Sequence, residues 1–311
     1  MTAPLLLAPR PAAADEGGVS FWLPGQFGSF AAVPASPGWS LGAVYYHASS
    51  DAGGDRQFQR GGRIAAGLDV NADLLFLAPS YAFPEPVLGG QFALQLTGVY
   101  GRAKVDTSAT LSGPLGRSLT IGESDSRTGI GDLYPMASLK WNQGVHNFMA
   151  YSMAGVPVGA YDKDRLANIG TNHWSLDAGG GYTYLDDKKG HELSAVFGFT
   201  YNFENSDTDY RNGTNVHLDW AASQFLSSTF HAGVAGYFYN QLSGDSGAGA
   251  TLGDFKSRVS AIGPQMGWFF KVGESTWYAN LKGFYEFDAK NRPEGWSVWA
   301  TLSLPLGPSK K

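Results

Sequence analysis

Apolar and polar residues alternate with period two along most of the chain beyond residue 38. In residues 296–306 every even position is apolar, whereas the odd positions include three serine or threonine residues. In residues 192–203 the odd positions carry the apolar side chains and the even positions include Glu, Ser, Thr and Asn. Because successive side chains of a strand point to opposite faces, each such segment predicts a strand with one apolar face.

About twelve segments of this kind are present, and each has the length that a tilted strand needs to cross a bilayer, roughly 9–11 residues. The predicted strands lie near residues 39–48, 62–82, 90–106, 129–141, 145–157, 172–185, 191–204, 214–226, 229–241, 257–271, 276–287 and 295–306.

The connections between these segments alternate in length. Short connections are predicted at 142–144, 186–190, 227–228 and 272–275, and long polar ones at 49–61, 107–128, 158–171, 205–213, 242–256 and 288–294. Short periplasmic turns and long outer loops are typical of outer-membrane barrels. The pattern therefore predicts an all-β fold, a transmembrane antiparallel up-and-down β-barrel of about 12 strands, with both of its ends in the periplasm.

The composition agrees with this fold class. Hydrophobic residues make up 43% of the chain and charged residues 16%, against roughly 25% charged in soluble domains. Tryptophans such as Trp141, Trp174 and Trp220 fall near predicted strand ends, where amphipathic rings prefer the lipid headgroups. No apolar run is long enough for a membrane helix. The net charge is −5, and acidic and basic residues are mixed along the chain, which argues against a nucleic-acid partner. The absence of cysteine excludes thiolate chemistry.

The first 38 residues differ from the rest. Residues 1–14 look like the remnant of a signal peptide, since Ala12 to Ala14 form a small-residue cleavage site before Asp15. Residues 15–38 form an apolar segment that Gly and Pro interrupt too often for a helix or a strand. Irregular backbone at membrane depth is tolerated only inside protein or along a cavity. Two placements remain open, a plug in the barrel lumen and a cap on the periplasmic rim.

The barrel itself is expected to span residues 39–306, followed by a tail at 307–311. Some of its strands are apolar on both faces, which predicts that part of the interior is apolar. A substrate path is therefore expected along the aromatic residues of the first segment and one such strand: Phe21, Trp22, Phe27, Phe30, Met149, Tyr151 and Met153. Consecutive glycines at 179–181 predict either sharp curvature of the strand or close approach of another group inside the barrel.

The sequence offers little catalytic or metal-binding chemistry. His173 and Ser175, and likewise His47 and Ser49, have the two-residue spacing of a histidine and a serine on one strand face, but no nucleophile-elbow motif accompanies them. Glu204, Asp207 and Asp209 are weak candidates for a metal site, and a solvated loop explains them better. No catalytic residue, metal or cofactor is expected.

Five blocks resemble the meta-pathway phenol-degradation family: GGVSFWLPGQFGSFAAVPASPGW (17–39), GIGDLYP (129–135), VPVGAYDKDRLANIGTNHWSLD (156–177), NFENSDTDYRNGTNVHLDW (202–220) and AIGPQMGWFF (261–270). The resemblance implies an outer-membrane channel of Gram-negative bacteria for hydrophobic, often aromatic, small molecules. It carries over no catalytic residue. If residues 17–38 lie in the lumen, they resemble the amino-terminal plugs of fatty-acid and toluene channels.

The expected function is therefore passive uptake of a hydrophobic, aromatic small molecule across the bacterial outer membrane. Outer-membrane lipid and lipopolysaccharide are the other expected partners, and a monomer is favoured. An outer-membrane lipid hydrolase using a His/Ser pair is the alternative, and a closed structural or adhesion barrel is a third reading. The sequence leaves open whether substrate leaves through the periplasmic mouth or sideways through the wall.

Overall fold

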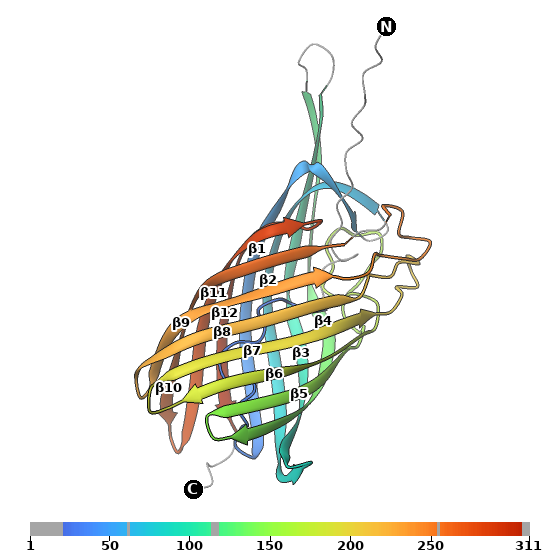
Figure 1. Cartoon of the computed structure of the whole chain (residues 1–311). Coiled ribbons are helices and arrows are strands. Elements are labelled where there is room, and N and C mark those ends of the chain that lie inside the picture. Colours follow the sequence, from blue (N-terminus) through green and yellow to red (C-terminus); the bar gives the residue numbers. More distant parts are fainter. Residues whose placement is uncertain (1–20, 61–62, 113–117, 254–255, 307–311) are drawn as a thin grey trace.

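The computed structural model describes residues 21–60, 63–112, 118–253 and 256–306, and these form a closed barrel of twelve strands (Figure 1). Each strand pairs antiparallel with the next, and β12 closes the barrel onto β1. The predicted fold class is confirmed. The strands are β1 (Gly38–Arg60), β2 (Arg63–Val87), β3 (Gly90–Ser112), β4 (Ser118–Gln143), β5 (His146–Gly155), β6 (Ser175–Asp186), β7 (His191–Asn202), β8 (Asn215–Ser227), β9 (Phe230–Gln241), β10 (Arg258–Val272), β11 (Ser275–Lys290) and β12 (Glu294–Pro305). Within the described residues no helix is long and apolar enough to cross a membrane.

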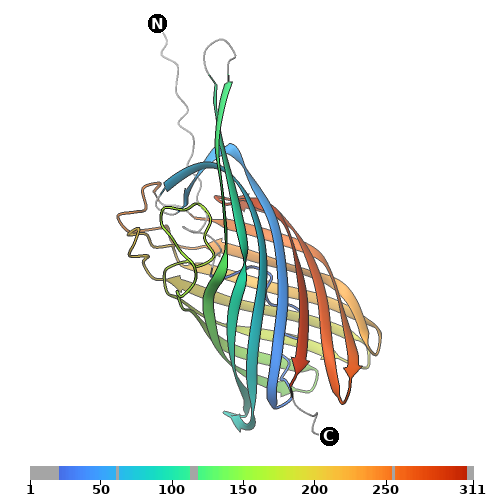
Figure 2. The ribbon, with the colours of Figure 1, turned by 180° about the vertical axis from the view of Figure 1, so that it is seen from behind.

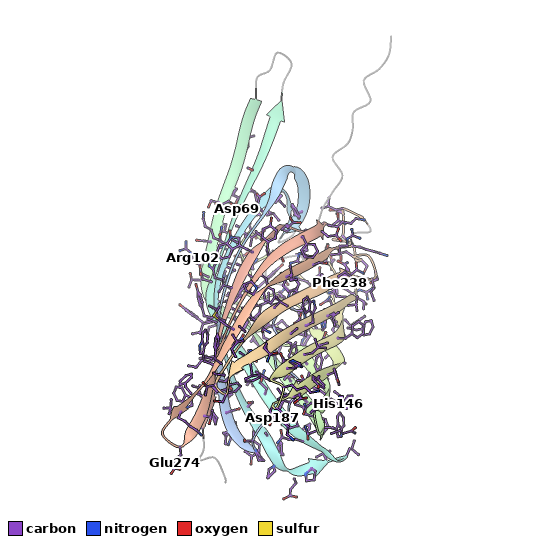
Figure 3. All side chains as sticks on the ribbon, turned by 60° about the vertical axis from the view of Figure 1, so that its left-hand side comes forward. Asp69, Arg102, His146, Asp187, Phe238 and Glu274 are labelled. Atoms are coloured by element: carbon purple, nitrogen blue, oxygen red, sulfur yellow. The ribbon has the colours of Figure 1, made fainter. Side chains whose placement is uncertain are left out.

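The two faces of the wall follow the alternation in the sequence. In β7 the polar side chains of Glu192, Ser194 and Thr200 are buried inside, whereas Phe197 and Phe199 stand exposed on the outer face. Large apolar side chains cover the outer face of other strands in the same way, among them Phe238 on β9 (Figure 3). Such an apolar band is stable against lipid hydrocarbon. The protein is therefore an outer-membrane barrel.

The two ends of the barrel differ. Asp187 and Glu274 lie in the short turns at one end (Figure 3), and the first and last strands also meet there, where Leu41 pairs with Leu304. Longer connections at the other end join β5 to β6, β7 to β8 and β9 to β10. By the rule that outer loops are long, the short-turn end faces the periplasm.

Several predicted loop boundaries are wrong. The long connections expected at 49–61 and 107–128 are largely strand, because β1, β2, β3 and β4 continue beyond the rim of the other strands (Figures 1 and 2). The connection expected at 288–294 also shrinks, since β11 continues to Lys290 and β12 starts at Glu294. In these extensions the sequence loses its regular apolar alternation while backbone pairing continues, as between Val105 and Asp125. Their inner face is still partly covered, since Phe58, Leu68 and Val105 are buried in a cluster with Leu166 and Ala167.

Candidate functional site in the barrel interior

Residues 21–37 precede β1 and lie among inward-facing side chains of the barrel (dark blue in Figure 1). Trp22 and Ala32 are fully buried, and Phe21 is nearly so. They belong to one apolar cluster with side chains from β5, β7, β8, β9, β10, β11 and β12, which include Met149, Val196, Ala221, Tyr237, Ala261, Phe284 and Trp299. An irregular segment in this position needs hydrogen-bond partners for its backbone.

Two buried charged residues supply partners in the middle of the segment. The carboxylate of Asp219 on β8 accepts the backbone N–H groups of Gly25 (2.9 Å) and Phe27 (3.0 Å). The ammonium group of Lys282 on β11 donates to the carbonyl oxygens of the same two residues, at 2.6 Å and 3.0 Å. The opposite charges thus bind both polar groups of Gly25 and Phe27, and they hold this part of the segment to two strands of the wall.

The polar inner face of β6 and β7 binds the next residues. Glu192 accepts the Ser29 hydroxyl (2.7 Å) and the Phe30 backbone N–H (3.2 Å), and Ser194 also accepts the latter (3.1 Å). The Ala32 N–H donates to the Thr183 hydroxyl (3.1 Å). Sequence reasoning did not find these partners. The sequence shows only that these partners are polar residues on strands in which polar and apolar positions alternate.

The glycines of β6 make room for an aromatic side chain inside the barrel. A Cβ atom at Gly179 would lie 2.9 Å from Cε1 of Tyr151 and closer still to backbone of β7. Of the two roles expected for the glycines at 179–181, curvature or close approach, the structure shows close approach at Gly179. Tyr151 in turn packs beside Trp22 and Phe27, with ring centroids 6.4 Å and 5.6 Å away.

An internal cavity of about 230 Å³ lies between the segment and the wall. Of the predicted path residues, Phe21, Phe27 and Met153 line it. The remaining lining residues come from the segment and from β1, β2, β3, β4 and β12: Leu23, Gln26, Val44, Phe76, Ala78, Gln95, Thr97, Tyr134, Met136 and Trp299. Trp22, Met149 and Tyr151 do not line it, and lie in the adjoining buried cluster.

Phe30 occupies a different place. Its ring packs against an aromatic group near the short turns, contributed by β8 to β11: Phe225, His231, Phe269 and Tyr278, with centroid distances of 6.0, 5.2, 5.7 and 5.6 Å. The backbone of Phe30 has a φ of 66°, which is uncommon for a non-glycine residue. Phe30 therefore holds the segment at the periplasmic end of the barrel. None of these four rings belongs to the cavity lining.

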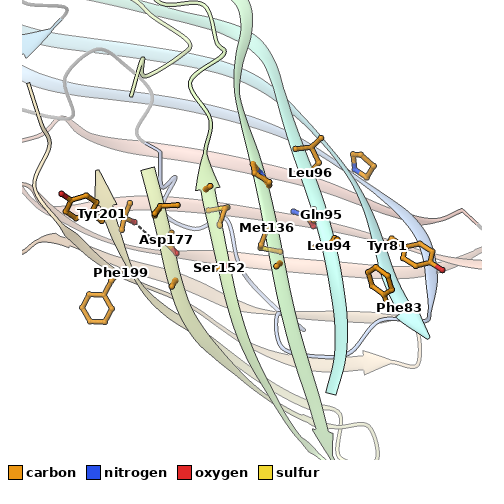
Figure 4. A pocket seen from close by; sticks show the side chains of 18 of the residues that line it. Tyr81, Phe83, Leu94, Gln95, Leu96, Met136, Ser152, Asp177, Phe199 and Tyr201 are labelled. Atoms are coloured by element: carbon orange, nitrogen blue, oxygen red, sulfur yellow. Dashed lines mark hydrogen bonds between the residues drawn. The ribbon is translucent and has the colours of Figure 1, made fainter. Parts of the chain in front are cut away.

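A groove of about 1220 Å³ crosses the membrane-facing surface of β2 to β7 (Figure 4). Its base consists of small outward residues, Pro135, Ala137, Ser152, Ala154 and Ala178, and its rims of larger ones, which include Leu94, Leu96, Leu176, Phe199 and Tyr201. Small side chains between large ones produce the hollow.

The groove and the internal cavity lie back to back. Gln95, Met136 and Met153 line both, so that only the wall formed by β3, β4 and β5 separates the two spaces. That wall has an interrupted ladder. Pairing of β4 with β5 stops at Met136 and resumes only as an isolated bridge at Leu133, with Pro135 in the gap. Proline has no N–H to donate, so it weakens a sheet interior.

The connection 156–174 packs into the opposite, outer end of the barrel. Asp132 on β4 is buried and accepts the backbone N–H groups of Gly159 and Thr171 and the Thr171 hydroxyl, each at 2.8 Å. Leu166 and Ile169 of the connection are also buried. The sequence predicted a long polar loop at 158–171. Asp132, which lies in the sequence block GIGDLYP (129–135), anchors this loop to β4.

The histidines of the two candidate catalytic pairs have different surroundings. The Ser175 hydroxyl donates to the side-chain oxygen Oδ1 of Asn202 at 2.9 Å and lies 3.3 Å from Nδ1 of His173, and both Ser175 and His173 are buried. His47 instead bonds to Asp73 on the outer face of the wall, at 2.8 Å. Buried and already hydrogen-bonded, Ser175 lacks the access that a substrate would need.

The three candidate metal-binding carboxylates lie on the outer loop between β7 and β8. Glu204, Asp207 and Asp209 are all exposed. Among the residues that the structure describes, no group of three or more His, Cys, Asp or Glu side chains could hold a metal ion. The solvated loop explains these residues.

Comparison with solved structures finds outer-membrane barrels. The chain superposes on an outer membrane channel of the COG4313 group from Pseudomonas putida F1 with a TM-score of 0.67 and 15% identity, over 87% of this chain and 96% of that one. A FadL homologue from Pseudomonas aeruginosa gives a TM-score of 0.42 and 9% identity, over 86% and 90% of the two chains.

A second comparison, with curated proteins, finds no match. A family model described as "Putative MetA-pathway of phenol degradation" matches residues 53–302. The match covers most of the barrel, from the upper part of β1 to β12. The chain therefore belongs to the family of the MetA-pathway of phenol degradation, as its sequence blocks indicated.

Proposed function

We propose that this protein is an outer-membrane channel for the passive uptake of hydrophobic, aromatic small molecules. The observation that carries the proposal is the pair of apolar spaces, the internal cavity and the membrane-facing groove, on the two sides of one interrupted wall at Pro135. Sites for drug-sized ligands usually exceed about 300 Å³. A cavity of about 230 Å³ therefore fits a molecule with a single ring.

In this proposal residues 21–37 act as a plug that blocks the straight path to the periplasm. The hydrogen bonds to Asp219, Lys282 and Glu192 hold its backbone in the lumen, and the Phe30 ring fills the region near the short turns. A hydrophobic molecule that reaches the cavity then leaves sideways, between β4 and β5, into the groove and the lipid. That the barrel of the same fold from Pseudomonas putida is an outer membrane channel also supports the proposal.

Passive movement follows from the chemistry of the lining. A hydrophobic molecule crosses the polar lipopolysaccharide surface slowly, and aromatic and methionine side chains lower that barrier. Binding must remain weak enough for release, which a small cavity with few polar contacts allows. The movement down a concentration gradient needs no energy source.

The test is uptake of radiolabelled toluene into cells that carry the protein in the outer membrane, with a labelled sugar of similar size as a control. We expect faster toluene entry than in cells without the protein, and unchanged sugar entry. Equal toluene entry, with insertion in the membrane verified, would rule out the channel.

Filling the groove tests the route through the wall. Ala154→Trp places a large ring on the base of the groove, and we expect toluene entry to fall several-fold. Val234→Trp is the matched control, because Val234 also faces lipid but lies on β9, outside the groove. Unchanged uptake in Ala154→Trp would contradict the sideways route and favour the periplasmic mouth.

A further inference from the structure

Two N–H donors of the cavity lining have no acceptor within the described part of the chain. They are the indole Nε1 of Trp299, on β12, and the side-chain Nε2 of Gln26, in the N-terminal segment. Both nitrogen atoms are buried, and Trp299 as a whole is only 4% exposed. The other amide of the lining differs, since Gln95 donates its Nε2–H to the hydroxyl of Thr97 at 3.1 Å.

Buried donors without an acceptor are rare, because each has lost its hydrogen bonds to water without replacing them. Most of the other lining residues are apolar and offer no acceptor: Phe21, Leu23, Phe27, Val44, Phe76, Ala78, Met136 and Met153. The polar ones, Gln95, Thr97 and Tyr134, form no hydrogen bond with either donor. An oxygen atom carried by a molecule in the cavity could accept from them. A few polar groups in a mostly apolar space are the arrangement that fixes the orientation of a small ligand.

The surrounding structure holds both donors in place. The Trp299 ring packs on Tyr46 with 4.5 Å between ring centroids, and Nζ of Lys282 lies 5.4 Å from the indole centroid. Gln26 lies between Gly25 and Phe27, the two residues whose backbone groups bind Asp219 and Lys282. Donors fixed before binding lose little conformational entropy when a ligand arrives.

We infer that the cavity selects single-ring aromatic compounds that carry a hydrogen-bond acceptor oxygen, such as aryl ketones, aldehydes or esters, over aromatic hydrocarbons of the same shape. Trp299 and Gln26 are the specificity-determining residues, and each donates to that oxygen. The inference rests on the proposed function, because it names the substrate class of the same cavity. An aromatic hydrocarbon still enters, but leaves the two donors unpaired.

The test compares two ligands of equal shape, 4-fluoroacetophenone and 4-fluoro-α-methylstyrene, in which a C=CH₂ group replaces C=O. Their binding to the purified, folded chain in detergent is measured by ¹⁹F NMR. We expect the ketone to bind about tenfold more tightly or better, since one net hydrogen bond corresponds to roughly that factor. Binding of the hydrocarbon gives the contribution of the apolar lining alone.

Two substitutions assign the donors. Trp299→Phe and Gln26→Leu remove one N–H donor each, and we expect each to weaken ketone binding about tenfold while hydrocarbon binding stays the same. Trp296→Phe is the matched control, because Trp296 lies on the same strand and faces outward. Since the two variants alter different elements, misfolding of one leaves the other as a test.

Equal binding of the two ligands to the unaltered protein would overturn the inference, as would full ketone preference in both variants. Uptake by cells is measured separately. Preferential ketone binding without uptake of either compound would support the inference and contradict the channel. Equal binding together with toluene uptake would overturn the inference and leave the channel standing.

Discussion

The indole ring of Trp22 stacks on the imidazole ring of His217, with 3.4 Å between the ring centroids and 16° between the planes. Both side chains are fully buried. Nε2 of His217 lies 2.9 Å from Oδ2 of Asp177, which also accepts the hydroxyl of Thr200 at 2.6 Å. Residues from β6, β7 and β8 thus fix the imidazole ring of His217, on which Trp22 of the N-terminal segment stacks. Substitutions that move this ring are expected to shift the segment inside the lumen.

Asp219→Ala is expected to release the N-terminal segment from the wall. The substitution removes two hydrogen bonds to a carboxylate, each worth about 1.5–3 kcal/mol, and leaves the charge of Lys282 without its partner. Conductance of small ions across a planar bilayer should then rise several-fold. Asp187→Ala, in an exposed short turn, should leave the conductance unchanged. Equal conductance of both variants and the unaltered protein would contradict the role of Asp219.

Gly198→Ala is expected to disturb the Trp22 stack from the wall side. A Cβ atom at Gly198 would lie 2.3 Å from the hydroxyl oxygen of Tyr151 and 2.7 Å from Cε1 of His217, so both rings must move. Overpacking of this kind costs about 1–3 kcal/mol. The measurement is the temperature at which the folded band disappears in gel electrophoresis, and we expect it to fall by several degrees.

The matched control for this prediction is Gly283→Ala on β11. The nearest atom to a Cβ there is the carbonyl oxygen of Ser297, at 4.0 Å, so the methyl group has room. Its unfolding temperature should stay within about a degree of the unaltered protein. A similar loss of stability in both variants would show that strand glycines in general, and not the rings beside Gly198, cause the effect.

Asp132→Ala is expected to free the outer connection 156–174 from the barrel end. Three hydrogen bonds from Gly159 and Thr171 disappear together, so local opening becomes more frequent. Trypsin added to intact cells should then cleave after Lys163 or Arg165 about tenfold faster or more, because three bonds are worth well over the 1.4 kcal/mol of a tenfold change. Asp207→Ala, an exposed carboxylate of the neighbouring outer loop, should leave the cleavage rate unchanged. Equal cleavage of Asp132→Ala and the unaltered protein would contradict the anchor.

The substrate-path residues show where prediction from sequence reached its limit. Phe21, Phe27 and Met153 line the cavity, but Phe30 packs in a separate aromatic group at the periplasmic end. All four are equally apolar in the sequence, and nothing local distinguishes them. The loops predicted at 49–61 and 107–128 failed for a related reason, since a strand that leaves the bilayer loses its apolar alternation but keeps its pairing.

The sequence by itself determined the number of strands, their membrane-facing sides and the class of fold. Pleating and the bilayer impose a local period of two that any strand must show, so reading it requires no knowledge of distant contacts. Only the tertiary structure decided the interior. The contact of Gly25 with Asp219 joins residues 194 positions apart, and that of Gly25 with Lys282 joins residues 257 apart. Closure of the barrel brings these groups together, and with them the donors of Trp299 and Gln26, because irregular backbone inside the lumen takes its partners from whichever strands surround it.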